Sequence, residues 1–160
     1  MVNPGQFLTF LLKGQFYGVP IAAVREINRF IEVTPIPQTP KFVAGVMNLR
    51  GKVIPVVNLR EKFSFEPVKN SKETCIVIIE TGDGQMGVIV DAVRSVVDLT
   101  AAQIEPTPRL GEESVESIIL GLGKLDDKVV ILIDIAATLS KDHLKQVVSL
   151  AGMASPKLSA

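Results

Sequence analysis

The chain has 160 residues, and its 17 lysines and arginines balance its 17 aspartates and glutamates, so the formal net charge is zero. That length suits one domain or two small subdomains, and the balanced charge lacks the basic surface of a nucleic-acid-binding protein or a polybasic membrane module. With a single cysteine, Cys75, an intramolecular disulfide is excluded and a reducing compartment is expected. The N-terminus lacks the basic start of a signal peptide, and no apolar run approaches the roughly 18 residues of a membrane span. We therefore expect a cytoplasmic protein that does not insert into a membrane.

Short apolar runs alternate with turn residues along the first half of the chain, a pattern typical of strands joined by hairpins. Lys13-Gly14 is the first turn, residues 21–23 suit one helical turn, and the prolines of residues 34–40 predict a loop because they remove backbone donors. Asn58 has a side chain suited to capping a short helix at 59–63. The predicted strands of this half are 7–12, 16–20, 24–33, 43–49 and 52–57.

The second half repeats this organisation after a polar connector at 66–72, the best candidate for a boundary between two halves. Residues 81–84 predict a hairpin turn, Thr100 and Gln103 have the spacing of a capping box, and residues 105–116 are typical of an exposed loop. The predicted strands of this half are 74–80, 85–97, 118–124 and 128–133.

The C-terminal part is expected to be helical and then irregular. Asp134 caps a predicted helix at about 135–150, and the small and polar residues 151–160 are expected to form a disordered tail. About ten short strands joined by hairpins, with only brief helices before the last one, predict a mainly β protein built as small barrels or a sandwich.

Two pairs of segments repeat along the chain and indicate an old duplication. Residues 45–63 match residues 121–139, and residues 18–25 match residues 87–94 in the same order. Chance similarity between short apolar strands is the alternative, but the turns and caps correspond as well as the Val and Ile positions do. The matched positions include Gly45 with Gly121, Leu49 with Leu125, Lys52 with Lys128, and Asn58 with Asp134.

Pro55 lies inside the predicted strand 52–57, where its counterpart in the second copy is Ile131. Proline cannot donate a backbone hydrogen bond, so within a sheet it is tolerated mainly at an edge or a bulge. We therefore expect this strand to lie at the edge of its sheet at Pro55.

No group of residues in the sequence predicts catalysis or metal binding. His143, the single histidine, lies among charged residues of a predicted helix, which is typical of a solvated surface. Cys75 opens an apolar strand and is expected in the core. Asp126-Asp127 is typical of a hairpin turn, and residues 81–85 lack the lysine and the glycine spacing of a phosphate-binding loop. We expect no cofactor and no enzymatic reaction.

Arg50 is a residue for which physical reasoning alone supports two interpretations equally. It stands at the tip of a predicted hairpin, and one interpretation is an exposed turn residue with no particular partner. The other is an anchor that pairs with a carboxylate on a partner or across the seam between the two halves. Arginine suits this second role because its fork binds carboxylates bidentately and loses water more readily than an ammonium group.

The chain resembles the CheW family, the coupling proteins of bacterial chemotaxis, from about residue 7 to residue 139. Asn58 stands where the family usually has Asp, and since either residue can cap a helix we expect little change. The resemblance is carried by V-R-E-I at 24–27, V-T-P-I-P at 33–37, G-V-M-N-L-R-G at 45–51, I-P-V-V-N-L-R at 54–60, G-V-I-V-D at 87–91 and G-L-G at 121–123.

The resemblance implies a single CheW-like domain at 7–150, made of two five-stranded barrels packed side by side. The first barrel would span about 15–70 and the second about 71–139, with the strand at 7–13 crossing over to join the second. The implied function is a non-catalytic adaptor between chemoreceptors and the histidine kinase CheA. One surface would bind the regulatory domain of the kinase, and a groove between the barrels would take the helical tip of the receptor. The free protein is expected to be a monomer that reaches receptor arrays near the inner membrane through these partners.

Matched residue by residue, six positions correspond to positions linked to partner binding in the family. For Val24 and Val96 a place in the core is the alternative, and for Gly45 it is a close approach of the backbone. The resemblance favours the anchoring interpretation of Arg50. The six residues, which the resemblance does not divide between receptor and kinase, are Arg50, Gly51, Val24, Glu26, Gly45 and Val96.

Two alternatives to the free-standing adaptor stay open. One is a CheW-like regulatory domain from a larger chemotaxis protein, although the N-terminal methionine and the short tail favour a free-standing chain. The other is a small-ligand-binding β-barrel protein that uses the groove between the barrels, which the lack of convergent polar residues argues against.

Overall fold

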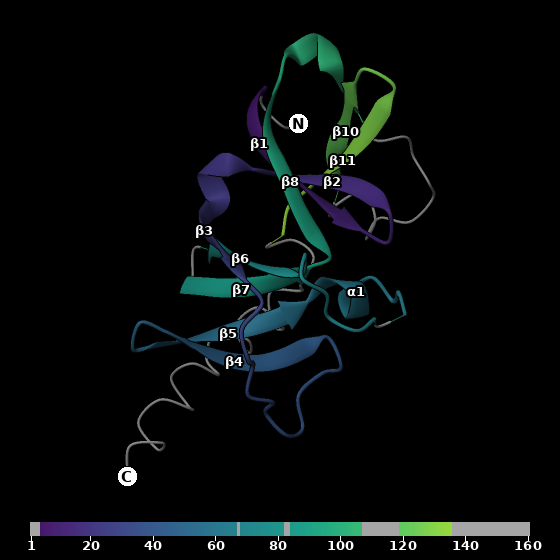
Figure 1. The fold of residues 1–160 in the computed structure, drawn as a ribbon. Helices are drawn as coiled ribbons and strands as arrows, with labels where there is room; N and C mark the ends of the chain where they lie inside the picture. Colours follow the sequence, from purple (N-terminus) through teal and green to yellow (C-terminus); the bar gives the residue numbers. More distant parts are fainter. Residues whose placement is uncertain (1–3, 67, 82–83, 107–118, 136–160) are drawn as a thin grey trace.

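The computed structural model describes residues 4–66, 68–81, 84–106 and 119–135, and it is built mainly of β-strands, as expected (Figure 1). The predicted C-terminal helix and tail, from residue 136 onward, lie outside the described residues. Short helical segments join some strands: η1 (Ile21–Ala23), α1 (Leu59–Lys62) and η2 (Ala101–Gln103). The strands are β1 (Gly5–Leu12), β2 (Gln15–Pro20), β3 (Val24–Arg29), β4 (Val43–Leu49), β5 (Lys52–Asn58), β6 (Cys75–Thr81), β7 (Gly84–Val90), β8 (Ala92–Leu99), β9 (Ile104–Glu105), β10 (Ile119–Leu125) and β11 (Lys128–Ile133).

The local turn and cap signals lie where the sequence predicts them. In the β1–β2 turn Lys13 and Gly14 have φ of 52° and 75°, and in the β4–β5 turn Arg50 and Gly51 have φ of 51° and 84°. Positive φ at both central residues is the backbone of a type I′ turn, whose twist matches that of the flanking strands. The side chain of Asn58 caps α1 by accepting a backbone N–H at 3.3 Å.

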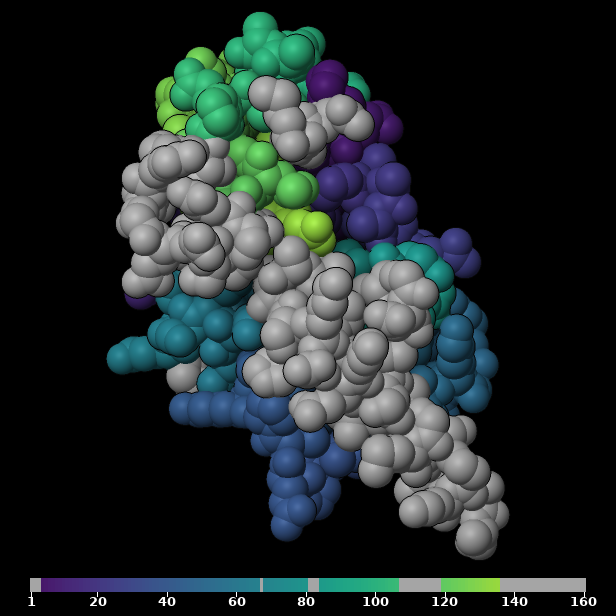
Figure 2. Space-filling model, turned by 180° about the vertical axis from the view of Figure 1, so that it is seen from behind, coloured from purple at the N-terminus to yellow at the C-terminus, as the bar shows by residue number. Residues whose placement is uncertain are grey.

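The strands form two sheets that lie one above the other in Figure 1. The upper sheet has six strands in the order β8-β1-β2-β11-β10-β9, and the lower sheet has five in the order β3-β6-β7-β5-β4. The helix α1 lies beside the lower sheet (Figure 1). From behind, the space-filling view shows residues of the six-stranded sheet above and residues of the five-stranded sheet below (Figure 2).

The two copies of the duplication exchange their first hairpins. The β1–β2 hairpin of the first copy lies in the six-stranded sheet, where β1 pairs antiparallel with β8 and β2 pairs parallel with β11. The β6–β7 hairpin of the second copy lies in the five-stranded sheet, where β6 pairs antiparallel with β3 and β7 pairs parallel with β5. Gly18 faces Leu132 in one parallel pair, and Gly87 faces Val56 in the other. The sequence repeats match Gly18 with Gly87 and Val56 with Leu132, so the two parallel pairs are equivalent in the two copies.

This exchange differs from the predicted division into a barrel at about 15–70 and a barrel at about 71–139 joined by the strand at 7–13. β2 stays with β1 in the six-stranded sheet, and β6 and β7 lie in the five-stranded sheet. The sequence repeats show which segments correspond. They do not show which copy's hairpin completes each sheet, because that depends on pairing between residues far apart in the sequence.

In each sheet the strand at one edge runs on into a segment that pairs at the other edge. After β3, Thr34 returns to β4, where it donates to the Val46 carbonyl at 2.8 Å and accepts the Val46 N–H at 2.9 Å. In the six-stranded sheet, η2 leads directly from β8 at one edge to β9 at the other, and β9 pairs with β10. One continuous segment of chain therefore links the two edges of each sheet.

The prediction that β5 lies at a sheet edge at Pro55 is wrong, because β5 pairs with β4 on one side and with β7 on the other. The residue opposite Pro55 in β4 is Val46, which directs its N–H and carbonyl to Thr34, so Val46 and Pro55 form a non-hydrogen-bonded pair. On the other side, the pairing with β7 begins only at Val56. The missing N–H of proline therefore falls where no ladder bond depends on it.

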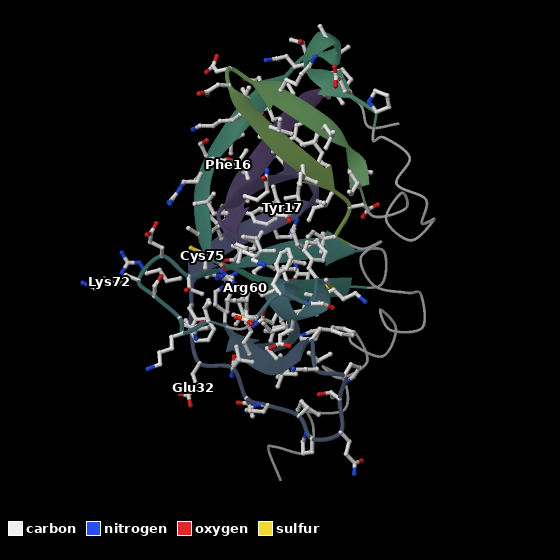
Figure 3. All side chains as sticks on the ribbon, turned by 90° about the vertical axis from the view of Figure 1, so that its right-hand side faces the viewer. Phe16, Tyr17, Glu32, Arg60, Lys72 and Cys75 are labelled. Carbon is white, nitrogen blue, oxygen red and sulfur yellow. The ribbon has the colours of Figure 1, made fainter. Side chains whose placement is uncertain are left out.

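A central apolar core lies between the two sheets and takes side chains from both. Tyr17 of β2 stacks on Phe10 with ring centroids 5.9 Å apart, and its ring also lies 5.9 Å from that of Phe63, just after α1. Figure 3 shows Tyr17 at the level where the two sheets meet. Side chains from β1 and β6 that are at most 2% exposed in this core are Leu8, Phe10, Leu12, Val77 and Ile79.

An ion pair between Arg60 and Asp91 links the two sheets at one end of this core. Arg60 in α1 donates to both carboxylate oxygens of Asp91, Nε to Oδ1 at 2.8 Å and Nη2 to Oδ2 at 2.7 Å. Asp91, which connects β7 to β8, also accepts the backbone N–H of Lys13 at 2.9 Å. Burial by itself would raise the pKa of Asp91, but the hydrogen bonds from Arg60 and Lys13 outweigh it and hold the pKa below its usual value.

Gly45 supplies the first prediction from this fold. Its φ is 140°, and a Cβ there would lie 2.0 Å from the Thr34 carbonyl oxygen. We expect Gly45→Ala to lower the free energy of unfolding by about 3 kcal/mol, since the Thr34 bridge to β4 would have to move. Chemical denaturation measures this loss. Gly5→Ala is the matched control, because Gly5 has φ of 152° but no atom within 4 Å of its Cβ position. Equal losses in the two variants would contradict the role of the Thr34 contact.

The second prediction concerns the pH dependence of the Arg60–Asp91 pair. Removing the charge with Asp91→Asn is expected to lower the free energy of unfolding at neutral pH by about 1–2 kcal/mol, because a partly solvated charged hydrogen-bond network is lost. Since the pKa of Asp91 is depressed on folding, its contribution is present above the unfolded value of about 3.9 and is lost as pH falls through the folded pKa. Denaturation curves of both proteins between pH 7 and pH 2 should therefore converge at low pH. A difference that stays constant with pH would contradict this role.

Candidate functional site

Arg50 occupies the tip of the β4–β5 hairpin and binds Glu26 of β3 with both arms of its guanidinium group. Nη1 donates to Oε2 at 3.2 Å, and Nη2 donates to Oε1. The N–H of Gly51 donates to the side-chain oxygen of Asn48 at 2.9 Å, which stabilises the turn that carries Arg50. The pair joins β3, one edge strand of the five-stranded sheet, to the hairpin of β4, the other edge strand. The carboxylate that binds Arg50 is thus in the same sheet and not across the seam between the halves.

The Arg50–Glu26 pair stays open to solvent. The Arg50 side chain is 70% exposed and that of Glu26 is 29% exposed. The hydrogen bond from Arg50 lowers the pKa of Glu26, and the carboxylate in turn raises the pKa of Arg50, so both groups are charged at neutral pH. Two of the five N–H donors of the guanidinium group contact Glu26, which leaves three for another acceptor.

A chain of polar contacts continues around the same end of the five-stranded sheet. Arg25 Nε of β3 lies 3.7 Å from Glu80 Oε2 of β6, and that oxygen accepts Nε2–H of Gln85 of β7 at 3.1 Å. Gln85 Oε1 in turn accepts from Lys52 Nζ of β5 at 3.4 Å. Together with the Arg50 pair, these contacts pass through the whole width of the sheet. The sequence did not reveal them, because each partner comes from a different strand.

The other three positions matched to the family lie in different surroundings. Gly45 is buried beside the Thr34 carbonyl, which supports the close-approach interpretation of this glycine. Val24 is half-buried and packs against the central core, which supports its interpretation as a core residue. Val96 of β8 is 48% exposed, so it is not a core residue, and it lies in the other sheet from Arg50 and Glu26.

Ile27 was not singled out in the sequence, although it is the counterpart of Val96 in the other copy. It lies in the edge strand β3 and is 41% exposed, and Val96 lies in the edge strand β8 of the other sheet. The repeat that matches residues 18–25 with residues 87–94 reaches these two positions if it is extended by two residues. That extension is the signal that would have found Ile27.

A hollow of about 230 Å³ lies between the two sheets, beside η1. Glu80 and Asp134 are the charged residues on its wall, and the rest of the lining is apolar. Such a wall suits an apolar side chain or segment better than a charged ligand. The apolar residues come from β2, η1, β6, β10 and the end of the described chain, and they are Val19, Pro20, Ala23, Ile79, Leu120 and Ile135.

The described residues offer little chemistry beyond these contacts. Among them, no group of three or more His, Cys, Asp or Glu side chains is placed to hold a metal ion. Cys75 is half-buried at the border of the central core, and its Sγ donates to the Glu73 carbonyl at 3.2 Å. His143 lies outside the described residues. Among the described residues we find no helix with the length and apolar character needed to cross a bilayer.

Comparison with known proteins gives matches over most of the chain. The curated relatives include Chemotaxis protein CheW of Klebsiella aerogenes, 37% identical over 139 residues, which cover 87% of this chain and 84% of that protein. Chemotaxis protein CheW of Helicobacter pylori is 31% identical over 137 residues, covering 86% of this chain and 82% of that protein. Among solved structures, the scaffolding protein TtCheW from Thermoanaerobacter tengcongensis matches with a TM-score of 0.75 at 36% identity, covering 82% of this chain and 89% of that one. The family model for the CheW-like domain matches residues 6–143, and the chain belongs to this family.

Proposed function

We propose that the protein is a non-catalytic adaptor that couples chemoreceptors to the histidine kinase CheA in chemotaxis. The family membership supports this function, as do relatives named as chemotaxis protein CheW and a structural neighbour named as a scaffolding protein. The structure adds an observation on this chain itself. Arg50 is held in a fixed position by Glu26, and it still presents most of its side chain and three donors to a partner.

The proposed partners are the regulatory domain of the kinase and the cytoplasmic tip of a chemoreceptor. The Arg50 surface, defined by Arg50, Gly51 and Glu26, is the proposed polar contact. The apolar hollow between the sheets is the proposed seat of the receptor tip, because a helical segment docks through apolar side chains in a groove with a polar rim. The zero net charge gives no support for nucleic-acid binding. The free protein is proposed to be a cytoplasmic monomer that is recruited to receptor arrays by its partners.

The other three matched positions, Val96, Val24 and Gly45, are proposed to act in different ways. Val96 is exposed on β8 and is proposed as a direct contact with a partner. Val24 and Gly45 are proposed to act indirectly, because Val24 of β3 packs against the central core and Gly45 permits the Thr34 bridge beside the hairpin of Arg50. The similarity found gives no support to the alternatives of a fragment of a larger protein or a small-ligand-binding barrel.

A calorimetric titration against the kinase regulatory domain and against a receptor tip tests the adaptor function. Arg50→Ala is expected to weaken binding to at least one of them about tenfold, or 1.4 kcal/mol, because arginine is among the residues most enriched in interface hot spots. Lys124→Ala is the matched control, since Lys124 is a 50% exposed cation paired with Glu105 at 2.7 Å on the other sheet. If the wild-type protein binds neither partner, the adaptor function is rejected.

A charge swap separates contact with a partner from closure of the sheet. The double variant Arg50→Glu with Glu26→Arg restores an ion pair between the hairpin and β3 but reverses the charge offered to a partner. We expect this variant to bind as weakly as Arg50→Ala. Recovery of wild-type affinity would instead assign Arg50 the structural task of joining β3 to the β4–β5 hairpin. Unchanged affinity in Arg50→Ala for both partners would remove Arg50 from the binding surface.

A further inference from the structure

Arg60 and Asp91 belong to the sequence runs that carry the family resemblance, yet neither lies at the Arg50 surface or in the hollow. The structure brings them together where the two sheets meet, at one end of the central core, and Figure 3 shows Arg60 just below Tyr17. The Arg60 side chain is 14% exposed and that of Asp91 is 25% exposed. Besides binding Asp91, Arg60 donates Nη1–H to the Glu66 carbonyl at 2.9 Å. These contacts tie α1, the following connector, the β1–β2 turn and the β7–β8 connection to one point.

The described chain crosses from one sheet to the other at two places that the sequence repeat makes equivalent. It leaves the six-stranded sheet through η1, between β2 and β3, and it returns through Asp91, between β7 and β8. The repeat aligns Ala22 of η1 with Asp91. It also aligns Arg60 with Ala136. Both members of the ion pair therefore have alanine as their counterpart, and only one crossing has the residues to form the pair.

The two crossings lie at opposite ends of the seam between the sheets. The ion pair holds the Lys13 end of the β1–β2 hairpin, whereas the hollow borders Val19 and Pro20 at the far end of β2. β2 has six residues, which at about 3.3 Å per residue separates these ends by roughly 16 Å. One end of the seam is thus fixed by directional hydrogen bonds, and the other end opens into the hollow.

The central core alone does not fix the angle between the sheets in the same way. Apolar packing is favourable but non-directional. Side chains such as Phe10 and Val77 therefore hold the sheets together but restrict the angle between them less than a hydrogen-bonded contact does. A bidentate arginine–carboxylate contact adds geometric specificity, because both pairs of atoms must stay aligned.

We infer that Arg60 and Asp91 are positioning residues that fix the angle between the two sheets and thereby set the width of the hollow at the opposite end of the seam. The inference rests on the proposed function for its consequence, which is control of the affinity for a receptor tip seated in the hollow. The contact with the kinase regulatory domain, if made by one sheet, does not depend on this angle.

The angle itself is measured without any partner. Spin labels are attached through Glu32→Cys, after β3 on the lower sheet (Figure 3), and Asp127→Cys, on the β10–β11 turn, in a Cys75→Ser background. Both positions are exposed. We expect one narrow distance distribution with the ion pair intact and a broadened or shifted one in Asp91→Asn. Glu105→Gln, which removes an exposed ion pair within one sheet, should leave the distribution unchanged. An unchanged distribution in Asp91→Asn would overturn the inference.

Binding affinities for the two partners test whether the ion pair controls receptor binding. In Asp91→Asn, binding of the receptor tip is expected to fall about tenfold, while binding of the kinase regulatory domain stays within about twofold. Equal losses for both partners, or no loss for the receptor tip, would overturn the inference, since a general loss of stability acts on both. If Asp91→Asn does not fold, Arg60→Lys keeps the charge without the two-armed contact and is measured instead. If the wild-type protein binds no receptor tip, the proposed function fails, and the distance measurement still decides the role of the ion pair.

Discussion

The exchange of hairpins between the two copies is the constraint on which the rest of the structure depends. β1 has its antiparallel partner in β8, and β6 has its partner in β3, so neither copy can complete a sheet with its own strands. The central core between β1 and β6 exists because both exchanged hairpins turn one face toward the seam. The two crossings of the chain, the hollow beside one and the ion pair at the other all follow from this arrangement.

Within this frame the backbone is nearly symmetric and the side chains are not. The tips of the two equivalent hairpins carry Arg50 and Asp126, with φ of 51° and 53°. Arg50 binds Glu26, whereas the counterpart of Glu26 is Ser95, which contacts Thr9 instead. The first residue of each tip thus has the same left-handed φ, and the two tips carry opposite charges. Such a division suits a protein that must present different surfaces to two different partners.

The local features could be predicted from the sequence, and the features that depend on distant pairing could not. The hairpin turn at Arg50-Gly51 and the cap at Asn58 depend on a few neighbouring residues, and the structure confirms both predictions. The family resemblance pointed to Arg50 and Glu26 separately, but their contact joins opposite edges of a sheet and has no signal in either stretch. The prediction from Pro55 was wrong because the rule about edges assumes that every residue of an inner strand needs its N–H. At this position of β5 no hydrogen bond of the sheet depends on that N–H. The assignment of strands to sheets failed for the same reason of distance.

The exchanged hairpins also decide when during synthesis the protein can fold. The β1–β2 hairpin leaves the ribosome first, but its partners in the six-stranded sheet are β8 and β11, which are among the last strands to be made. The five-stranded sheet likewise needs β6 and β7 before β3, β4 and β5 have a complete set of neighbours. The five-stranded sheet consists of the consecutive strands β3 to β7 and can be completed once β7 is made, whereas the apolar faces of β1 and β2 stay uncovered until β8 and β11 follow. The six-stranded sheet is therefore expected to form late, and until then the β1–β2 hairpin is the part of the chain that most needs protection from aggregation.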